Sequence, residues 1–103
     1  MANSPAMEKA LKSIEMTFNP ERKAITDKKF AMTRTATMLA DPHWASRAWS
    51  NVADYDITDT DQLVDAMIEL RDAEEEFVGH EFIVGADWNV RDLNKAIEKV
   101  KNL

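Results

Sequence analysis

Apolar residues recur every three or four positions through the segment 61–78, which makes it the most regular element of the chain. This repeat places side chains on one face of an α-helix. Gly79 stands where such a helix is expected to end. The residues predicted to face the core from this helix are Leu63, Ala66, Met67, Leu70, Ala73 and Phe77.

Two further helices are predicted from their start signals. The pairs Ser4-Pro5 and Asp41-Pro42 each join a capping residue to a proline suited to the first helical position. Apolar residues at helical spacing follow both pairs. We therefore expect one helix to begin near residue 5 and another to span 42–53.

The last part of the chain predicts a short strand and a final helix. An apolar run at 81–84 lies between Gly79 and Gly85, as in a buried strand. Asn89 is the predicted N-cap of the helix that follows. Its predicted core face consists of Leu93, Ala96, Ile97 and Val100.

Apolar and polar residues alternate in two stretches of the segment 14–38, separated by Asn19-Pro20. The second stretch carries threonine at every other position, and β-branched residues favour strands. The segment is therefore predicted to form a hairpin with a long loop. Its second strand places Phe30, Met32, Ala36 and Met38 on one face and Thr33, Thr35 and Thr37 on the other.

These elements predict an α+β fold for residues 1–103: one small, mainly helical domain with a short two- or three-stranded sheet. An all-α bundle is the alternative. A chain of 103 residues with 45% hydrophobic content can bury one core but not two. The absence of cysteine excludes disulfides, thiolate zinc sites and a cysteine nucleophile.

The sequence contains no apolar run of the roughly 18 residues that a membrane span requires. Glu8, Lys9 and Lys12 interrupt the apolar positions near the N-terminus, so this region does not resemble a secretory signal. We therefore expect a cytoplasmic protein without a membrane partner.

Charge is unevenly distributed along the chain, whose formal net charge is -6. Residues 1–39 carry seven bases and four acids, whereas residues 54–87 carry twelve acids and one base. Nucleic-acid binding requires cations that displace condensed counterions. The acidic stretch therefore disfavours direct nucleic-acid binding and indicates a partner with a basic surface.

Five carboxylates in the predicted helix 61–78 are spaced by three or four residues, so they lie within about 40° of one line along the helix. Like charges at this spacing destabilise a helix by about 0.2 to 0.5 kcal/mol per pair. One interpretation is a binding surface for a basic partner, and the other is a solvated face that maintains solubility. The residues concerned are Asp61, Asp65, Glu69, Asp72 and Glu76.

Trp44 and Trp49 are five residues apart and diverge by about 140° on a helix. One is therefore expected to pack inward, and the other to lie at the surface as a candidate apolar anchor, because tryptophan is enriched in binding hot spots.

Motifs for catalysis or metal binding are incomplete. Asp54, Asp56, Asp59 and Asp61 resemble a calcium loop, but Asp59 falls where that loop needs glycine. His43 and His80 are the only histidines, and they do not have the spacing of a zinc site. We expect no enzyme activity, no cofactor and no metal.

The sequence therefore predicts a small acidic interaction protein whose acidic helix docks a basic surface. An inhibitor or accessory subunit of a nucleic-acid-binding protein, by mimicry of nucleic acid, would suit this charge. The alternatives are a structural homo-oligomer, assembled through amphipathic helices or a sheet edge, and a small-molecule pocket lined by tryptophan and methionine.

Overall fold

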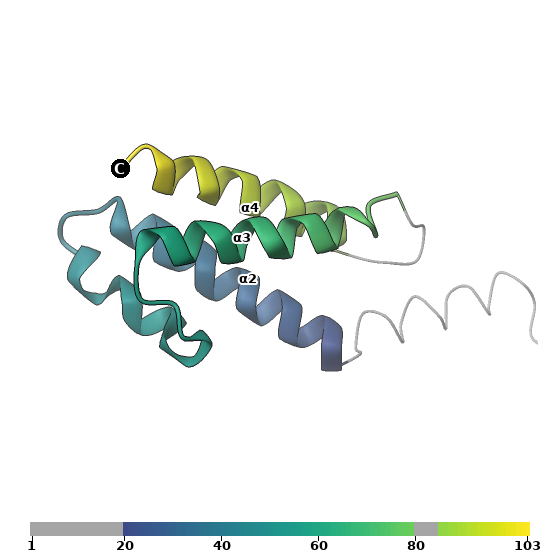
Figure 1. Ribbon diagram of the computed structural model, residues 1–103, viewed down its shortest axis with the longest axis horizontal. Coiled ribbons are helices and arrows are strands. Elements are labelled where there is room, and N and C mark those ends of the chain that lie inside the picture. Colours follow the sequence, from purple (N-terminus) through teal and green to yellow (C-terminus); the bar gives the residue numbers. More distant parts are fainter. Residues whose placement is uncertain (1–19, 80–84) are drawn as a thin grey trace, which may run out of the picture.

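The computed structural model describes residues 20–79 and 85–103, which form three α-helices and one 3-10 helix. The three α-helices lie side by side, and η1 packs against α2 (Figure 1). The helices in chain order are α2 (Pro20–Leu39), η1 (Ala45–Tyr55), α3 (Thr60–Glu75) and α4 (Ala86–Lys101).

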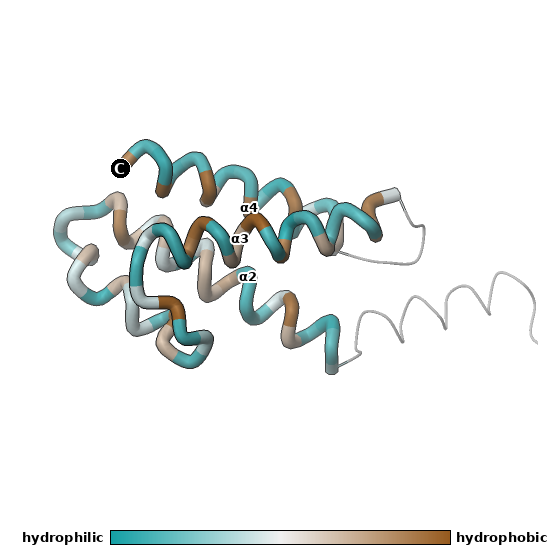
Figure 2. Tube along the Cα trace, in the orientation of Figure 1, coloured by the Kyte–Doolittle hydropathy of each residue, from teal (hydrophilic) through white to brown (hydrophobic). Residues whose placement is uncertain are grey.

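The core is formed where α2, α3 and α4 face one another, with additional residues from η1 and the turn after it. Hydrophobic residues on α3 and α4 recur at intervals along each helix (Figure 2). Such amphipathic helices are stabilised mainly by burial of their apolar faces. The core residues are Met32, Ala36, Val52, Ile57, Leu63, Met67, Leu93, Ala96, Ile97 and Val100.

The predicted α+β fold is wrong, because the described residues contain no strand, and the all-α alternative fits instead. Within the predicted hairpin 14–38, the part from residue 20 onward belongs to α2. Residues 14–19, the predicted helix near residue 5 and the predicted strand 81–84 lie outside the described residues.

The threonines of α2 explain why the strand prediction failed. The Thr35 hydroxyl donates a hydrogen bond to the Ala31 carbonyl at 2.8 Å, and Thr37 donates likewise to Thr33 at 3.1 Å. Bonding to the carbonyl one turn earlier accommodates threonine within a helix. Burial also follows the helical repeat, because Met32 and Ala36 are fully buried whereas Phe30 is exposed.

Two predicted helix starts are displaced in the structure. The helix predicted over 42–53 is the 3-10 helix η1, and Asp41 instead accepts a hydrogen bond from the backbone N–H of His43. Asn89 does not cap the last helix, because α4 begins at Ala86 after Gly85. Gly85 has a φ of +94°, a conformation that glycine adopts without the steric cost of a side chain.

The helix predicted over 61–78 is α3, with its C-terminal end at Glu75. Its start is defined by Asp59, whose carboxylate accepts a hydrogen bond from the backbone N–H of Gln62 at 2.8 Å. The Gln62 side chain in turn accepts a hydrogen bond from the backbone N–H of Thr58 at 2.7 Å. The two bonds satisfy the backbone N–H groups of Thr58, just before the helix, and of Gln62, in its first turn, and so resemble a capping box.

Candidate functional site

The five aligned carboxylates on and just after α3 are all exposed, and we call them the acidic face. Their orientation follows from the core residues of the same helix. Leu63 and Met67 are fully buried, which directs the opposite side of α3 toward solvent. The acidic face consists of Asp61, Asp65, Glu69, Asp72 and Glu76.

Only one carboxylate of the acidic face has an ion-pair partner within residues 20–79 and 85–103. Asp72 accepts from the guanidinium of Arg71, its neighbour in sequence, at 3.1 Å. The other four make no hydrogen bond or ion pair through their side chains in this part of the chain. Some of the other described carboxylates do pair with cations: Asp27 with Lys23, Glu74 with Arg22, Asp87 with Arg91 and Asp92 with Lys29.

Glu74 differs from the other carboxylates of α3, because it is buried. Its side chain is 1% exposed and lies among the three α-helices. Arg22 donates to both of its carboxylate oxygens at 3.0 Å, and Asn89 donates at 3.3 Å. The positive charge of Arg22 offsets the free-energy cost of burying the Glu74 carboxylate. Ala73, predicted to face the core, is exposed.

The two candidate tryptophans have different environments. Trp49 is partly buried and packs against the core, whereas Trp44 is 43% exposed at the start of η1. Neither residue belongs to α3, which carries the acidic face. Trp88 on α4 is 66% exposed, the highest exposure among the large hydrophobic residues that the structure describes, and the sequence-based interpretation did not select it.

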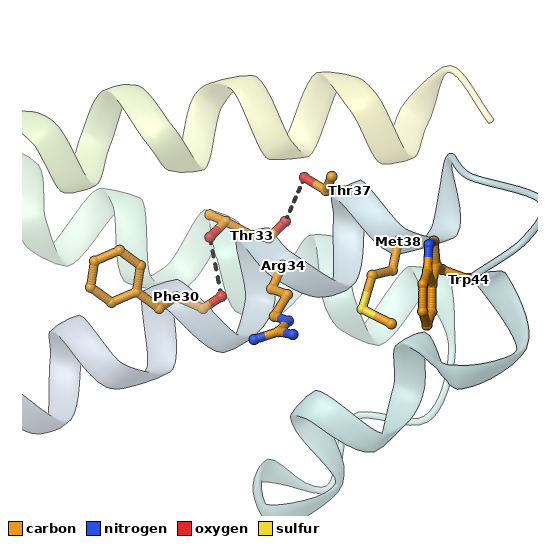
Figure 3. Close-up of a pocket in the computed structure, with 6 residues that line it drawn as sticks. All are labelled: Phe30, Thr33, Arg34, Thr37, Met38 and Trp44. Atoms are coloured by element: carbon orange, nitrogen blue, oxygen red, sulfur yellow. Dashed lines mark hydrogen bonds between the residues drawn. The ribbon is translucent and has the colours of Figure 1, made fainter.

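Trp44 lines an open hollow of about 700 Å³ along the outer side of α2, which we call the α2 groove. Figure 3 shows Phe30 at one end, Met38 alongside the Trp44 indole at the other, and Arg34 between them. The sequence indicated a pocket lined by tryptophan and methionine only in general terms. The groove residues are Phe30, Thr33, Arg34, Thr37, Met38 and Trp44.

Two absences hold for the part of the chain that the structure describes. Residues 20–79 and 85–103 contain no group of three or more histidine, aspartate or glutamate side chains placed to hold a metal ion. None of their helices combines the length and apolar character needed to cross a bilayer. His43 packs edge-on against Trp44, with 4.9 Å between ring centroids, and His80 lies outside the described residues.

Comparisons with protein-family models, with curated proteins and with solved structures found no match for this chain.

Proposed function

We propose that this protein is a non-enzymatic interaction protein whose acidic face docks a basic surface of another protein. The observation that carries this proposal is the alignment of exposed carboxylates along one side of α3. Cations within the described residues neutralise Glu74 and Asp92, whereas Asp61, Asp65, Glu69 and Glu76 are exposed without such a partner. An exposed row of uncompensated charge attracts an opposite charge over a Debye length of about 8 to 10 Å.

The energetics of α3 support a role in binding. Asp61 at the helix start interacts favourably with the helix dipole. Asp65 and Glu69 lie further along, where the dipole contributes little, and Asp72 lies in the last turn, where the dipole disfavours a carboxylate. Like charges one turn apart along this face also repel. These three carboxylates therefore weaken the helix slightly, and a basic partner would relieve this repulsion.

The chemistry of the face also suggests what kind of partner it serves. Its carboxylates are about 4.5 to 6 Å apart along the helix axis, compared with one phosphate per about 3.4 Å of axis on each DNA strand. The match to a phosphate path is loose, but both present a row of anions to arginine and lysine side chains. We therefore propose an inhibitor or accessory subunit of a nucleic-acid-binding protein.

The proposal is tested by affinity capture from a cell extract at about 50 mM and 200 mM salt, with identification of the captured proteins. The test variant replaces Asp65, Glu69 and Asp72 by their amides. Capture of a basic protein by the wild type at low salt, and its loss in the variant, would support the proposal. Equal capture by both proteins at both salt concentrations would refute it.

A matched control removes the same charge from other surfaces. Asp54, Asp56 and Glu98 are exposed and lie outside the acidic face, and their side chains make no ion pair within the described residues. Replacing these three by amides should leave capture of the basic protein unchanged. Equal loss in both variants would mean that net charge, rather than the acidic face, drives the interaction.

A further inference from the structure

Helix α2 carries a second row of side chains besides the row that it buries. Met32 and Ala36 are fully buried in the core, whereas Phe30, Arg34 and Met38 line the α2 groove on another side of the helix. These three residues are four positions apart, so successive members are separated by about 6 Å along the axis. The row therefore alternates apolar, cationic and apolar groups, one helical turn at a time.

Arg34, in the middle of this row, is exposed and makes no hydrogen bond or ion pair with residues 20–79 or 85–103. Other cations of the same helix are paired: Arg22 with Glu74, and Lys29 with Asp92 at 2.8 Å. The guanidinium of Arg34 is therefore available to a carboxylate from outside the described chain. Arginine suits this contact because its planar fork binds a carboxylate through two hydrogen bonds.

A cation lies near each of the aromatic rings at the two ends of the groove. The ammonium of Lys29 lies 3.8 Å from the centroid of the Phe30 ring. At the other end, the Arg47 guanidinium lies 5.8 Å from the Trp44 ring. Both rings are nevertheless open to a partner, because Phe30 is 58% and Trp44 is 43% exposed.

We propose that the α2 groove binds an amphipathic helix of a partner protein. The partner helix carries a carboxylate with an apolar residue one turn before it and another one turn after it. Charge complementarity and spacing support this occupant, because such a helix lying along α2 places an apolar residue at each aromatic end and its carboxylate at Arg34. Binding through an apolar stripe with residues one turn apart is a common mode of helix recognition.

The open shape of the groove favours a helix over a small molecule. Small-molecule sites enclose most of their ligand, whereas this groove lies along the outer side of α2 (Figure 3). Tryptophan and arginine are also the residue types that most often dominate the binding energy of protein interfaces. Trp44 and Arg34 bring both types to the same groove.

The probes that test this proposal are three fluorescently labelled, alanine-based helical peptides. The first carries leucine, glutamate and leucine at successive turns, and the other two replace the glutamate by glutamine or lysine. Fluorescence anisotropy measures their affinity for the full chain. We expect the glutamate peptide to bind about tenfold or more tightly than the other two.

Variants of the groove then locate the site. Phe30→Ala should weaken binding of the glutamate peptide. Arg34→Glu should reverse the order of affinities, so that the lysine peptide binds more tightly than the glutamate peptide. Trp88→Ala and Arg91→Glu on α4 are matched controls for Phe30→Ala and Arg34→Glu, because they change an exposed aromatic residue and an exposed arginine outside the groove. Both controls should bind the glutamate peptide as the wild type does.

Three outcomes would overturn the proposal. Equal affinity for the three peptides would exclude a contact between Arg34 and a carboxylate. Undiminished binding of the glutamate peptide to Arg34→Glu would place its site elsewhere. A dimer in sedimentation that Arg34→Glu dissociates, together with no binding of any peptide, would identify a second copy of this chain as the occupant instead.

Discussion

Arg22 and Glu74 form an ion pair across the interior of the helical core, with one guanidinium nitrogen 3.0 Å from each carboxylate oxygen. The two side chains are 11% and 1% exposed. Asn89 donates a further hydrogen bond to Glu74, so the carboxylate joins α2, α3 and α4. Little solvent is present to replace a lost partner, which makes this contact sensitive to removal of either residue.

The first prediction concerns this pair. Glu74→Ala leaves the Arg22 charge nearly buried and unpaired, and we expect the free energy of unfolding to fall by about 3 to 5 kcal/mol. A double-mutant cycle with Arg22→Ala should give a coupling energy of about 0.5 to 3 kcal/mol, measured by urea denaturation.

The matched control for this cycle is the exposed pair Lys23–Asp27 within α2, whose charged atoms are 2.9 Å apart. Solvent-exposed pairs of this kind contribute little to stability, because water and salt screen their attraction. If the Arg22–Glu74 coupling energy is no larger than that of the control pair, burial does not strengthen the contribution of this ion pair to stability.

The second prediction is an asymmetry within the Lys29–Asp92 pair, which links α2 to α4. Lys29 is 4% exposed, whereas Asp92 is 49% exposed. Asp92→Ala leaves a buried ammonium without its carboxylate and should cost about 1 to 3 kcal/mol. Lys29→Met leaves a carboxylate that water can solvate, so stability should change by less than about 1 kcal/mol. Thermal or urea denaturation of the two variants distinguishes these values, and equal losses would contradict the argument.

The third prediction compares two apolar residues of α3. Met67 is fully buried, whereas Leu70 is only partly buried beside the core. Met67→Ala should destabilise the protein by about 2 to 5 kcal/mol, and Leu70→Ala by clearly less, because less apolar surface leaves the core. A larger loss for Leu70→Ala in chemical denaturation would show that α3 is rotated relative to the orientation described above.

The fourth prediction concerns the stability of the acidic face rather than its binding. Replacing Asp65, Glu69 and Asp72 by amides removes repulsion between carboxylates one turn apart. Asp72 also loses its contact with Arg71, but exposed pairs contribute little. The melting temperature should therefore stay level or rise by a few degrees at low salt, with a smaller change at high salt. A marked fall, measured by circular dichroism, would indicate that these carboxylates stabilise the fold.

The periodic pattern of the sequence was sufficient to predict α3 and the core face of α4. Leu93, Ala96, Ile97 and Val100 are all buried as predicted, because two amphipathic helices with one apolar face each leave few alternatives for burial. The same periodicity predicted the common alignment of the acidic residues.

The remaining features depend on tertiary contacts. The threonine-rich segment taken alone predicts a strand. In the structure it is part of α2, because Met32 and Ala36, four residues apart, are both buried in the core. Glu74 is buried because Arg22, 52 residues earlier, reaches its carboxylate. The α2 groove likewise forms only where the chain after α2 brings Trp44 beside Met38. The local pattern of apolar and polar residues does not specify these contacts, because each depends on how the chain folds beyond the helix that carries the residue.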